Sequence, residues 1–340
     1  MVNKIYVKIK NFIVENYKTL LLFLAVYVIF NFELPYIVYA PGGTINLNER
    51  IEIEDAYPVK GKVRMAYVTA IKGSVPFLLT SFILPDWDIV KKEDITMENE
   101  NIDQMIKKDK LALESSIDNA TIVAYNLANE QVDITKIHNN VVYITKEAET
   151  NLKLNDEIIS VNGVEIKSLE EYKKIVESSN IGDVLNLKVL RNKKVIDANI
   201  KVYDTEYGYK TGISIITTFD YNTKKDIKVK KKSSESGPSG GAMLALEIFN
   251  LLTKKDITGG LNIVGTGTID IDGKIGEIGG VKYKLMGAVK NKADIFICPK
   301  ENYEEAKTIA KEKKYDIIII TDEKLEGIIK QLHKITKKEN

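Results

Sequence analysis

The sequence is poor in the residues that usually build disulfides and metal sites. Its 340 residues include one cysteine, Cys298, and two histidines, His138 and His333. A single cysteine excludes an intramolecular disulfide and a thiolate zinc site, and two histidines leave little for a histidine-based metal cluster. We therefore expect no metal and no other cofactor.

An excess of charge of one sign is also missing. Lys and Arg number 49 and Asp and Glu 48, which gives a net charge of +1. This balance argues against a dedicated nucleic-acid binder, because such proteins need a basic surplus. The hydrophobic fraction of 44% and the charged fraction of 29% exclude global disorder. At roughly 150 residues per domain, the length predicts two or three domains.

A long uninterrupted apolar run is absent, although a shorter one lies near the N-terminus. The mean hydropathy of -0.14 excludes a polytopic membrane protein but not one anchor. The run from Thr19 to Phe30 is shorter than the ~20 residues that a spanning helix needs. Apolar character resumes over Leu34–Tyr39, so a span from Lys18 to Tyr39 would be long enough if Glu33 reaches the headgroups.

The lysines before this run predict its orientation; they are Lys4, Lys8, Lys10 and Lys18. We expect residues 1–18 to form a cytoplasmic tail, residues 19–40 to form a single-pass anchor of the cell membrane, and the following domains to be extracellular. A cleaved signal peptide has the same charge order, and a buried core helix is a second alternative.

Three segments are expected between the anchor and residue 131. Lys62–Ala70 and Gly73–Leu84 are each predicted to form a strand, the second being broken by Pro76 and too short to span a membrane. Glu93–Ala128 is charged, has a helical pattern and contains no Gly or Pro, which predicts a long helix or a helical hairpin.

The next segment predicts a strand, a hairpin and a capped helix, followed by strands over 184–190 and 195–202. Asn162-Gly163 is a strong hairpin signal, and Ser168 with Glu171 is typical of a capped helix start. Together these features resemble a PDZ domain, which we place over residues 131–203.

The PDZ resemblance implies a peptide site as well. A peptide would add as a strand beside the expected strand 141–144, at Val141, Val142 and Tyr143. Ile137–Asn140 stands where the carboxylate-binding loop would be, so His138 is expected in a loop. The alternative is a rigid spacer without a ligand.

Residues 204–340 alternate strands with helices. The patterns predict strands over 211–217, 226–230, 263–267, 268–271, 294–298 and 316–321, and helices over 239–252, 281–290, 302–313 and 323–334.

A tight turn with a serine opens the first of these helices. Gly237 and Pro238 force the turn, and Ser239 stands at the helix N-terminus, where backbone N–H groups and the helix dipole favour a developing oxyanion. A simple N-cap serine has the same pattern. A serine nucleophile needs a base, and neither histidine lies in a context that suits one.

Two lysines offer an alternative base. They follow Gly279-Gly280, a pair that would let another backbone pass closely, and they are Lys282 and Lys284. A desolvated lysine near a helix N-terminus loses basicity and can accept a serine proton. Helical periodicity does not choose between the two, and a pair of surface lysines would give the same pattern.

Three motifs occur in order: Gly237-Pro238-Ser239-Gly240, Gly265-Thr266-Gly267, and Gly279-Gly280 followed by the lysines. Together they resemble the proteolytic domain of the Lon family. The resemblance implies an α+β fold of mixed sheets with helices, with Ser239 as the nucleophile and Lys284 as the general base. It further implies that Thr266 orients the lysine and that Gly237, Pro238 and Gly240 support the serine.

Two positions depart from the family pattern. Ser236 stands where an Asp is common, and Gly240 stands where an Ala is common. Both replacements are close in size to the usual residue, so we expect them to be tolerated.

Anchor, PDZ-like unit and Lon-type domain together resemble the membrane-anchored, PDZ-containing Lon-like proteases of bacteria. In that group the PDZ domain interrupts the proteolytic domain, so residues 41–130 should supply protease strands and residues 204–340 the rest. The resemblance also implies homo-oligomers such as hexamers. No Gly-x4-Gly-Lys-Ser/Thr phosphate loop occurs, so we expect ATP-independent cleavage of peptides or of unfolded, flexible proteins.

A basic stretch over 224–232 precedes the serine turn. Ile227 and Val229 alternate there with charged residues, as in an edge strand. A substrate could pair with this strand and be attracted by its charge. A lysine face that protects an edge is the alternative.

The main hypothesis is therefore an ATP-independent serine endopeptidase at the outer face of the membrane. The alternative is a membrane-tethered, PDZ-containing adaptor with an inactive protease fold. Nucleotide binding at the glycine turns is excluded by the lack of a phosphate loop.

Overall fold

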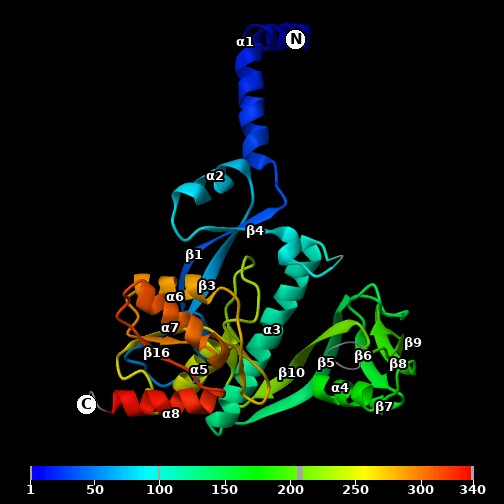
Figure 1. Cartoon of the computed structure of the whole chain (residues 1–340), viewed down its shortest axis with the longest axis vertical. Coiled ribbons are helices and arrows are strands. Elements are labelled where there is room, and N and C mark those ends of the chain that lie inside the picture. Colours follow the sequence, from blue (N-terminus) through cyan, green and yellow to red (C-terminus); the bar gives the residue numbers. More distant parts are fainter. Residues whose placement is uncertain (1, 99, 205–209, 338–340) are drawn as a thin grey trace. The chain divides into compact units, whose positions relative to one another are not determined.

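The computed structural model describes residues 2–98, 100–204 and 210–337 of the chain. Two compact units are distinguished: Met1–Pro41 with Val68–Ile95, named unit 1, and Gly42–Tyr67 with Thr96–Asn340, named unit 2. Figure 1 colours the elements in chain order. Two long strands, β1 (Tyr36–Asn46) and β3 (Lys62–Lys72), contribute residues to both units.

Unit 1 begins with a long helix, α1 (Val2–Asn31), whose described side chains are almost all exposed. Its segment Lys4–Asn31 is long and apolar enough to be a candidate membrane span. The helix ends at Asn31, so the predicted extension of the span to Tyr39 is wrong and the candidate span lies closer to the N-terminus.

A strand replaces the expected end of the span. Residues 36–39 of β1 pair antiparallel with β4 (Asp88–Lys91), which is followed by the 3-10 turn η1 (Lys92–Asp94). Pro35 has no amide hydrogen and disfavours a helical conformation at Leu34, so the helix stops before them.

The strand predicted over Gly73–Leu84 is also wrong, because Val75–Ile83 forms helix α2. Pro76 lies in the first helical turn, where a missing amide hydrogen removes no helical hydrogen bond. Proline thus begins this helix instead of interrupting a strand. None of the α2 residues is buried.

The centre of unit 2 is a parallel sheet. Its strands lie in the order β16 (Ile318–Ile320), β15 (Ile295–Ile297), β12 (Asn262–Gly265) and β3, and each neighbouring pair is parallel. The predicted strand over Lys62–Ala70 is confirmed, and it pairs with a strand that lies far away in the sequence.

Helices cover both faces of this sheet. On one face α5 (Gly241–Leu252) and α8 (Leu325–Thr336) share a core with strand residues that include Ile263, Ile295 and Ile297. On the other face α6 (Val281–Lys290) and α7 (Tyr303–Glu312) pack on Val264 and Phe296. The side chains of a strand alternate between its two faces, which separates the two cores. A 3-10 turn, η2 (Lys300–Asn302), precedes α7.

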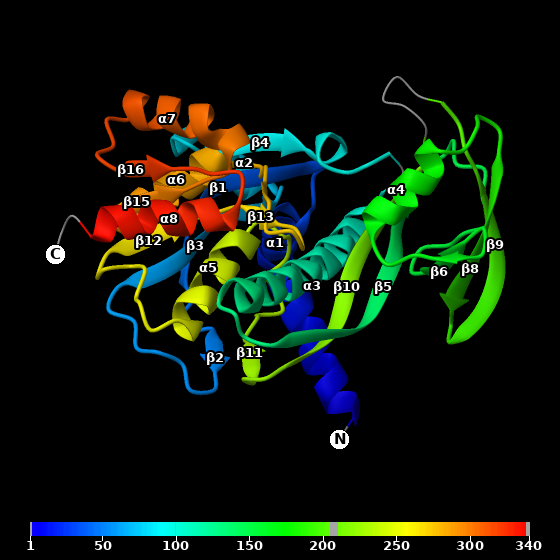
Figure 2. The same cartoon turned by 90° about the horizontal axis from the view of Figure 1, so that it is seen from below.

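The segment predicted as a long helix or a hairpin is one helix, α3 (Ile102–Leu127). Asn101 caps it, and Asn101 and Gln104 form a reciprocal capping box. α3 packs along α5 (Figure 2).

The PDZ-like part of unit 2 is a six-stranded antiparallel sheet with one helix. Its strand order is β10-β5-β6-β8-β9, and β7 pairs with β6. The bounds are β5 (Val132–Ile144), β6 (Glu157–Val161), β7 (Val164–Glu165), α4 (Leu169–Glu177), β8 (Val184–Arg191), β9 (Lys194–Lys201) and β10 (Ile213–Thr223).

Local signals in this part are confirmed. Asn162 and Gly163 have φ of 50° and 81°, as a tight hairpin requires, and the Ser168 hydroxyl accepts a hydrogen bond from the Glu171 amide at 3.1 Å. One assignment changes: β10, predicted in the C-terminal domain, pairs along its length with β5 and completes this sheet.

Two short antiparallel ribbons complete unit 2. β11 (Ile227–Val229) pairs with β2 (Ile51–Ile53), and β13 (Thr268–Ile269) pairs with β14 (Ile275–Gly276). The helices and strands predicted after residue 226 are thereby confirmed, apart from shifts of a few residues at their ends.

Candidate active site

The serine turn lies directly before α5. Gly237 has φ of 87°, a left-handed conformation that favours glycine, and Gly240 is the N-cap residue of α5. Ser239 is half-buried between them. Ser239 therefore lies at a helix N-terminus, as the sequence predicted.

Hydrogen bonds fix this turn to the end of β12. The Ser239 carbonyl accepts from the Thr266 hydroxyl at 3.0 Å and from the Gly267 amide at 2.8 Å. The Ala242 amide donates to the Gly267 carbonyl at 3.0 Å. Thr266 is fully buried. The Gly265-Thr266-Gly267 motif therefore holds the serine turn in place through these hydrogen bonds.

Helix α3 holds the same turn from its other side. The Ser116 hydroxyl donates to the Pro238 carbonyl at 3.0 Å, and the Gly237 amide donates to the Asp109 carbonyl at 2.9 Å. The sequence analysis missed both α3 residues. No local signal could have found them, because a buried serine within a helix resembles any other small core residue.

Lys284 is buried on α6, with 4% of its surface exposed. Burial lowers the pKa of its ammonium from 10.5 to about 8. Among the described residues it has no ion-pair partner, so no carboxylate opposes this shift. Lys282 is half-buried, and its ammonium lies 5.3 Å from the centre of the Tyr283 ring. Burial thus distinguishes Lys284 from Lys282, whereas helical periodicity in the sequence did not.

The predicted catalytic residues, Ser239 and Lys284, lie in two segments that both contact β12 or the residues directly after it. α6 packs on Val264 of β12, and the Ser239 turn bonds to Thr266, two residues further along. No hydrogen bond between the Ser239 hydroxyl and the Lys284 ammonium is found within the described part of the chain. The hydroxyl of Thr266 donates to the Ser239 carbonyl.

The glycines of the motifs act differently from what their pattern suggested. A side chain at Gly279 would meet nothing within 4 Å, so no backbone passes closely there, whereas Gly280 needs its φ of 70°. The close approach occurs at Gly287, whose added Cβ would lie 3.3 Å from the Gly43 carbonyl oxygen. At Gly240 an added Cβ would lie 2.6 Å from the Met65 sulfur, so Met65 fills the space that an alanine at this position would need.

The basic strand before the serine is already paired on one edge. Ile227 and Val229 of β11 lie opposite Ile53 and Ile51 of β2, and their side chains pack against the core. The charges of this stretch are partly neutralised: Lys230 pairs with Glu52, and Lys231 lies 2.7 Å from Glu114. Attraction of a substrate by this stretch is correspondingly weaker than its sequence indicates.

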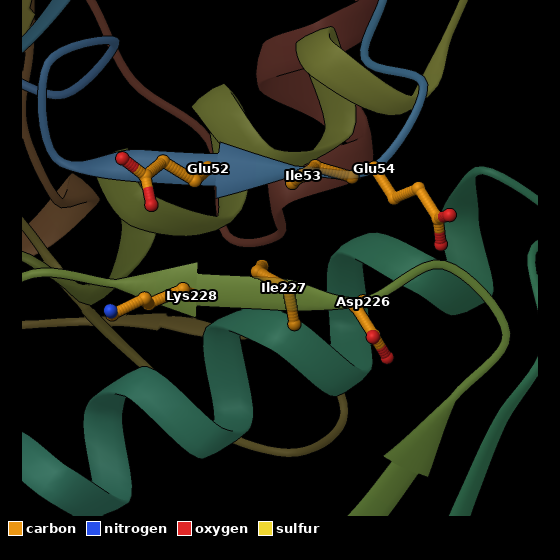
Figure 3. Close-up of a pocket in the computed structure, with 6 residues that line it drawn as sticks. All are labelled: Glu52, Ile53, Glu54, Asp226, Ile227 and Lys228. Atoms are coloured by element: carbon orange, nitrogen blue, oxygen red, sulfur yellow. The ribbon is translucent and has the colours of Figure 1, made fainter.

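A hollow of about 420 Å³ follows the β2–β11 ribbon (Figure 3). Figure 3 shows Glu52 and Lys228 at one end of the ribbon and Glu54 and Asp226 at the other. Neither Ser239, Lys284 nor Thr266 lines this hollow.

The predicted peptide site beside Val141 is blocked on both edges. Val141 lies opposite Ile215 of β10, and on its other edge it exchanges hydrogen bonds with residues 155 and 156. Val142 and Tyr143 lie in the same strand, β5. The Tyr143 hydroxyl donates to the Glu98 carbonyl at 2.6 Å. β10 and β9 lie at the two ends of this strand order, and α4 contacts β10.

His138 lies in β5 and not in a loop. Its Nδ1 is 3.0 Å from Glu157 and its Nε2 is 3.1 Å from Asp220. The loop prediction failed because β5 begins at Val132 and pairs with β10 through the expected loop residues. These contacts tie three strands together and lie in the PDZ-like sheet, apart from the serine turn.

Comparison with known proteins shows where the similarity lies. The family model of the Lon protease (S16) C-terminal proteolytic domain matches residues 149–334. Lon protease of Clostridioides difficile (strain 630) is 27% identical over 169 residues, 49% of this chain and 20% of that protein. Lon protease of Mesomycoplasma hyopneumoniae (strain 232) is 39% identical over 102 residues, 29% of this chain and 11% of that protein. The chain thus spans only a small part of the length of these relatives.

A solved structure is similar to a part of the chain. The PDZ domain of an SdrC-like protein from Listeria monocytogenes covers 25% of this chain and 93% of that domain, with 21% identity and a TM-score of 0.23. The family model extends over more than half of the 340 residues. The chain therefore belongs to the family of the Lon protease (S16) C-terminal proteolytic domain.

Proposed function

We propose that this chain is a serine peptidase that cleaves peptides or flexible protein segments, with Ser239 as the nucleophile and Lys284 as the general base. Its family supports peptidase chemistry. The observation that carries the assignment is the buried Lys284 ammonium, on a helix that packs on the strand to whose end the Ser239 turn is bonded. A buried lysine without an ion-pair partner among the described residues is costly for stability, and general-base catalysis accounts for it.

The first half-reaction forms an acyl ester. The neutral Lys284 amine takes the proton of the Ser239 hydroxyl, and Oγ attacks the scissile carbonyl carbon. The carbonyl oxygen becomes an oxyanion. Among the described residues the amides of Ser239 and Gly240 donate to no protein acceptor, and they lie at the N-terminal end of α5, so we assign the oxyanion to them. The carbonyl then re-forms, the scissile C–N bond breaks, and the Lys284 ammonium protonates the leaving amine, which leaves the acyl ester on Ser239.

The second half-reaction uses the same groups in reverse. Lys284, neutral again, takes a proton from a water molecule, and the water oxygen attacks the ester carbon. The ester bond breaks, and Ser239 Oγ regains its proton from the Lys284 ammonium. Thr266 positions the serine by holding its carbonyl, and its hydroxyl oxygen retains lone pairs that a lysine N–H could use.

The hydroxyl and the ammonium must come together for this chemistry. Catalytic hydrogen bonds are often long in a free enzyme and tighten when substrate binds. We expect substrate binding beside the serine turn to exclude water and complete the dyad.

The place of action and the energy source are part of the proposal. The candidate span, in which every lysine precedes the apolar run from Thr19 to Phe30, supports an anchor with the catalytic unit at the outer face. The 340 residues contain no phosphate loop, so this chain would act without ATP on substrates that are already unfolded or flexible. Hexamers remain a prediction from the resemblance.

The PDZ-like sheet supplies one docking position for a substrate. The half of β10 near α3 is satisfied by side chains: the Ser115 hydroxyl donates to the Thr217 carbonyl at 2.6 Å, and Asp118 accepts from the Phe219 amide at 3.0 Å. The half that begins at Ile213 lies beside α4. A peptide strand would add there rather than beside Val141.

The proposal is tested with the full-length protein, an unstructured fluorogenic peptide and a serine-reactive fluorophosphonate. Ser239→Ala and Lys284→Ala should abolish cleavage, and Ser239→Ala should also abolish labelling. Lys282→Ala is the matched control, because it removes a neighbouring lysine from the same helix and should leave most activity. Labelling that persists in Ser239→Ala, or a wild-type protein that binds peptide without cleaving it, would favour the adaptor hypothesis.

A further inference from the structure

Helix α2 has an apolar surface that the described part of the protein leaves exposed. None of its nine residues is buried, and no charged residue occurs between Lys72 and Asp86. Phe82 is 79% exposed and Ile83 is 80% exposed. The other large exposed apolar side chains of this segment are Phe77, Leu79 and Leu84. Single exposed apolar residues are normal, but a group of five within eight positions marks a contact surface.

This surface lies close to the end of the candidate span, within unit 1. α2 contacts α1 (Figure 1). Two hydrogen bonds join the chain that leaves α1 to the residue before the cap of α2: the Leu34 amide donates to the Gly73 carbonyl at 2.7 Å, and the Gly73 amide donates to the Tyr36 carbonyl at 2.9 Å. A bilayer spanned by α1 therefore has its surface within reach of α2.

Ion pairs lie near the end of α1, close to the start of α2. Glu33, just past the end of α1, lies 2.7 Å from the Lys72 ammonium and 3.7 Å from that of Lys92. The hydrogen bond from Lys72 holds the pKa of the Glu33 carboxyl below its usual value. These ion pairs suit the headgroup region, where charges stay hydrated.

A tryptophan follows α2 after a short turn. Trp87 is the only tryptophan of the chain, and it is half-buried directly before β4. Tryptophan prefers the boundary between acyl chains and water, because its ring is apolar and its N–H needs a polar partner.

We propose that α2 lies in the outer surface of the bilayer as an interfacial helix, with Phe82 and Ile83 among the lipid acyl chains. The inference rests on the proposed membrane anchoring by α1. Lipid is the occupant that the structure favours, because the exposed apolar surface is continuous in unit 1 with the helix that spans the bilayer. Transfer of these side chains from water to acyl chains would stabilise the docked helix.

The test uses the full-length protein reconstituted in phosphatidylcholine vesicles that contain lipids brominated at shallow or deep positions. Bromine quenches tryptophan fluorescence on contact, and all of the signal comes from Trp87. We expect strong quenching by the shallow bromines. Phe82→Ser with Ile83→Ser should reduce the quenching at least about threefold while the protein still floats with the vesicles, because α1 is unchanged.

A matched control removes two exposed apolar side chains elsewhere. Val184→Ser with Val195→Ser, on β8 and β9 of the PDZ-like sheet, should leave the quenching of Trp87 unchanged; both residues are more than half exposed. A second reporter reads α2 itself: Phe82→Trp in a Trp87→Phe background should be quenched by the deep bromines more strongly than Trp87 is.

The outcomes separate the two hypotheses. A protein that does not float with vesicles contradicts the anchor, and with it the inference that depends on it. A protein that floats but shows no quenching, or quenching that survives Phe82→Ser with Ile83→Ser, contradicts the interfacial helix alone. A lower oligomeric mass of the double variant in detergent, with unquenched Trp87 in the wild type, would instead identify a second copy of the chain as the occupant.

Discussion

Helices α5 and α2 are both short and apolar, yet their burial is opposite. In α5 every residue except Phe249 is buried, whereas in α2 none is. α5 lies between the parallel sheet and α3, and the serine turn at its N-terminus is bonded from both sides. α2 contacts α1 and has its large side chains exposed.

The difference shows that the apolar composition of a helix indicates that it contacts an apolar surface, but not which surface that is. Packing on a sheet gives α5 one fixed position, which a nucleophile requires. A lipid surface accepts α2 without fixing any single contact. The two helices should therefore respond differently to substitution.

The largest expected effect concerns the proposed reaction centre at the start of α5. Ser239→Ala and Lys284→Ala should each lower kcat/KM about 10³-fold or more, and the double variant little further, because the two groups act as one unit. Wild-type activity should rise with pH through about 8, since deprotonation of Lys284 supplies the base. Steady-state kinetics on an unstructured peptide from pH 6 to 9 measures both. A pH profile that is flat over this range would contradict the role of Lys284.

A matched pair of leucines compares the two helices directly. Leu246→Ala in α5 should lower the free energy of unfolding by about 2–5 kcal/mol, because it leaves a cavity in a closed core. Leu79→Ala in α2 should change it by about 0.5 kcal/mol or less, since that side chain is 59% exposed. Urea unfolding of the detergent-solubilised protein measures both, and equal losses would show that α2 is a core helix.

A buried carboxyl makes α5 sensitive to pH. Glu247 is fully buried, and its carboxyl accepts hydrogen bonds from the Asn48 side chain at 3.3 Å and from the Asn250 side chain at 3.4 Å. Burial raises its pKa from 4.5 to about 7. The folded state then binds a proton that the unfolded state has lost, so the stability that this proton contributes falls as the pH rises from about 4.5 to 7.

Glu247→Gln should remove this dependence. The variant should unfold with a free energy up to about 3 kcal/mol above wild type at pH 8 and close to it at pH 4.5. Urea unfolding at both pH values is the measurement. Glu54→Gln, at an exposed site, is the control and should not change the pH dependence. A Glu247→Gln protein less stable than wild type at pH 8 would show that the carboxylate is needed in its charged form.

The smallest expected effect comes from α3. Ser116→Ala removes the hydrogen bond to the Pro238 carbonyl, which still accepts from the Gly241 amide at 3.1 Å. We expect kcat to fall about fivefold, corresponding to about 1 kcal/mol, with little change in KM. Ser115→Ala, whose hydroxyl bonds to Thr217 of β10 instead, should leave kcat unchanged. Equal effects of the two substitutions would contradict a positioning role for Ser116.

Strong local patterns predicted the C-terminal half of the fold well. The helix over Val281–Lys290 has the predicted bounds, and the serine turn lies where its glycines and proline require. Helix periodicity and turn residues act over a few positions, so the sequence carries them completely. The strand predicted over Gly73–Leu84 was wrong because the local pattern was ambiguous: apolar residues 75–83 suit a strand or a helix, and Pro76 is compatible with the first turn of a helix.

Long-range pairing escaped the sequence analysis for a different reason. β10 closes the PDZ-like sheet against β5, which blocks the strand edge where a peptide was expected. The register of two strands that lie far apart in the sequence depends on their meeting in space, and neither strand carries a signal for the other.

The sequence by itself determined the motifs, their order, the helix that begins after the serine and the helix on which the lysines lie, because these depend on neighbouring residues. Only the tertiary structure decided that Lys284 is buried while Lys282 is half-buried, that α3 holds the serine turn, and that α2 stays exposed. Burial is a property of what packs around a residue, and it is burial that lowers the pKa of Lys284 and distinguishes it from Lys282.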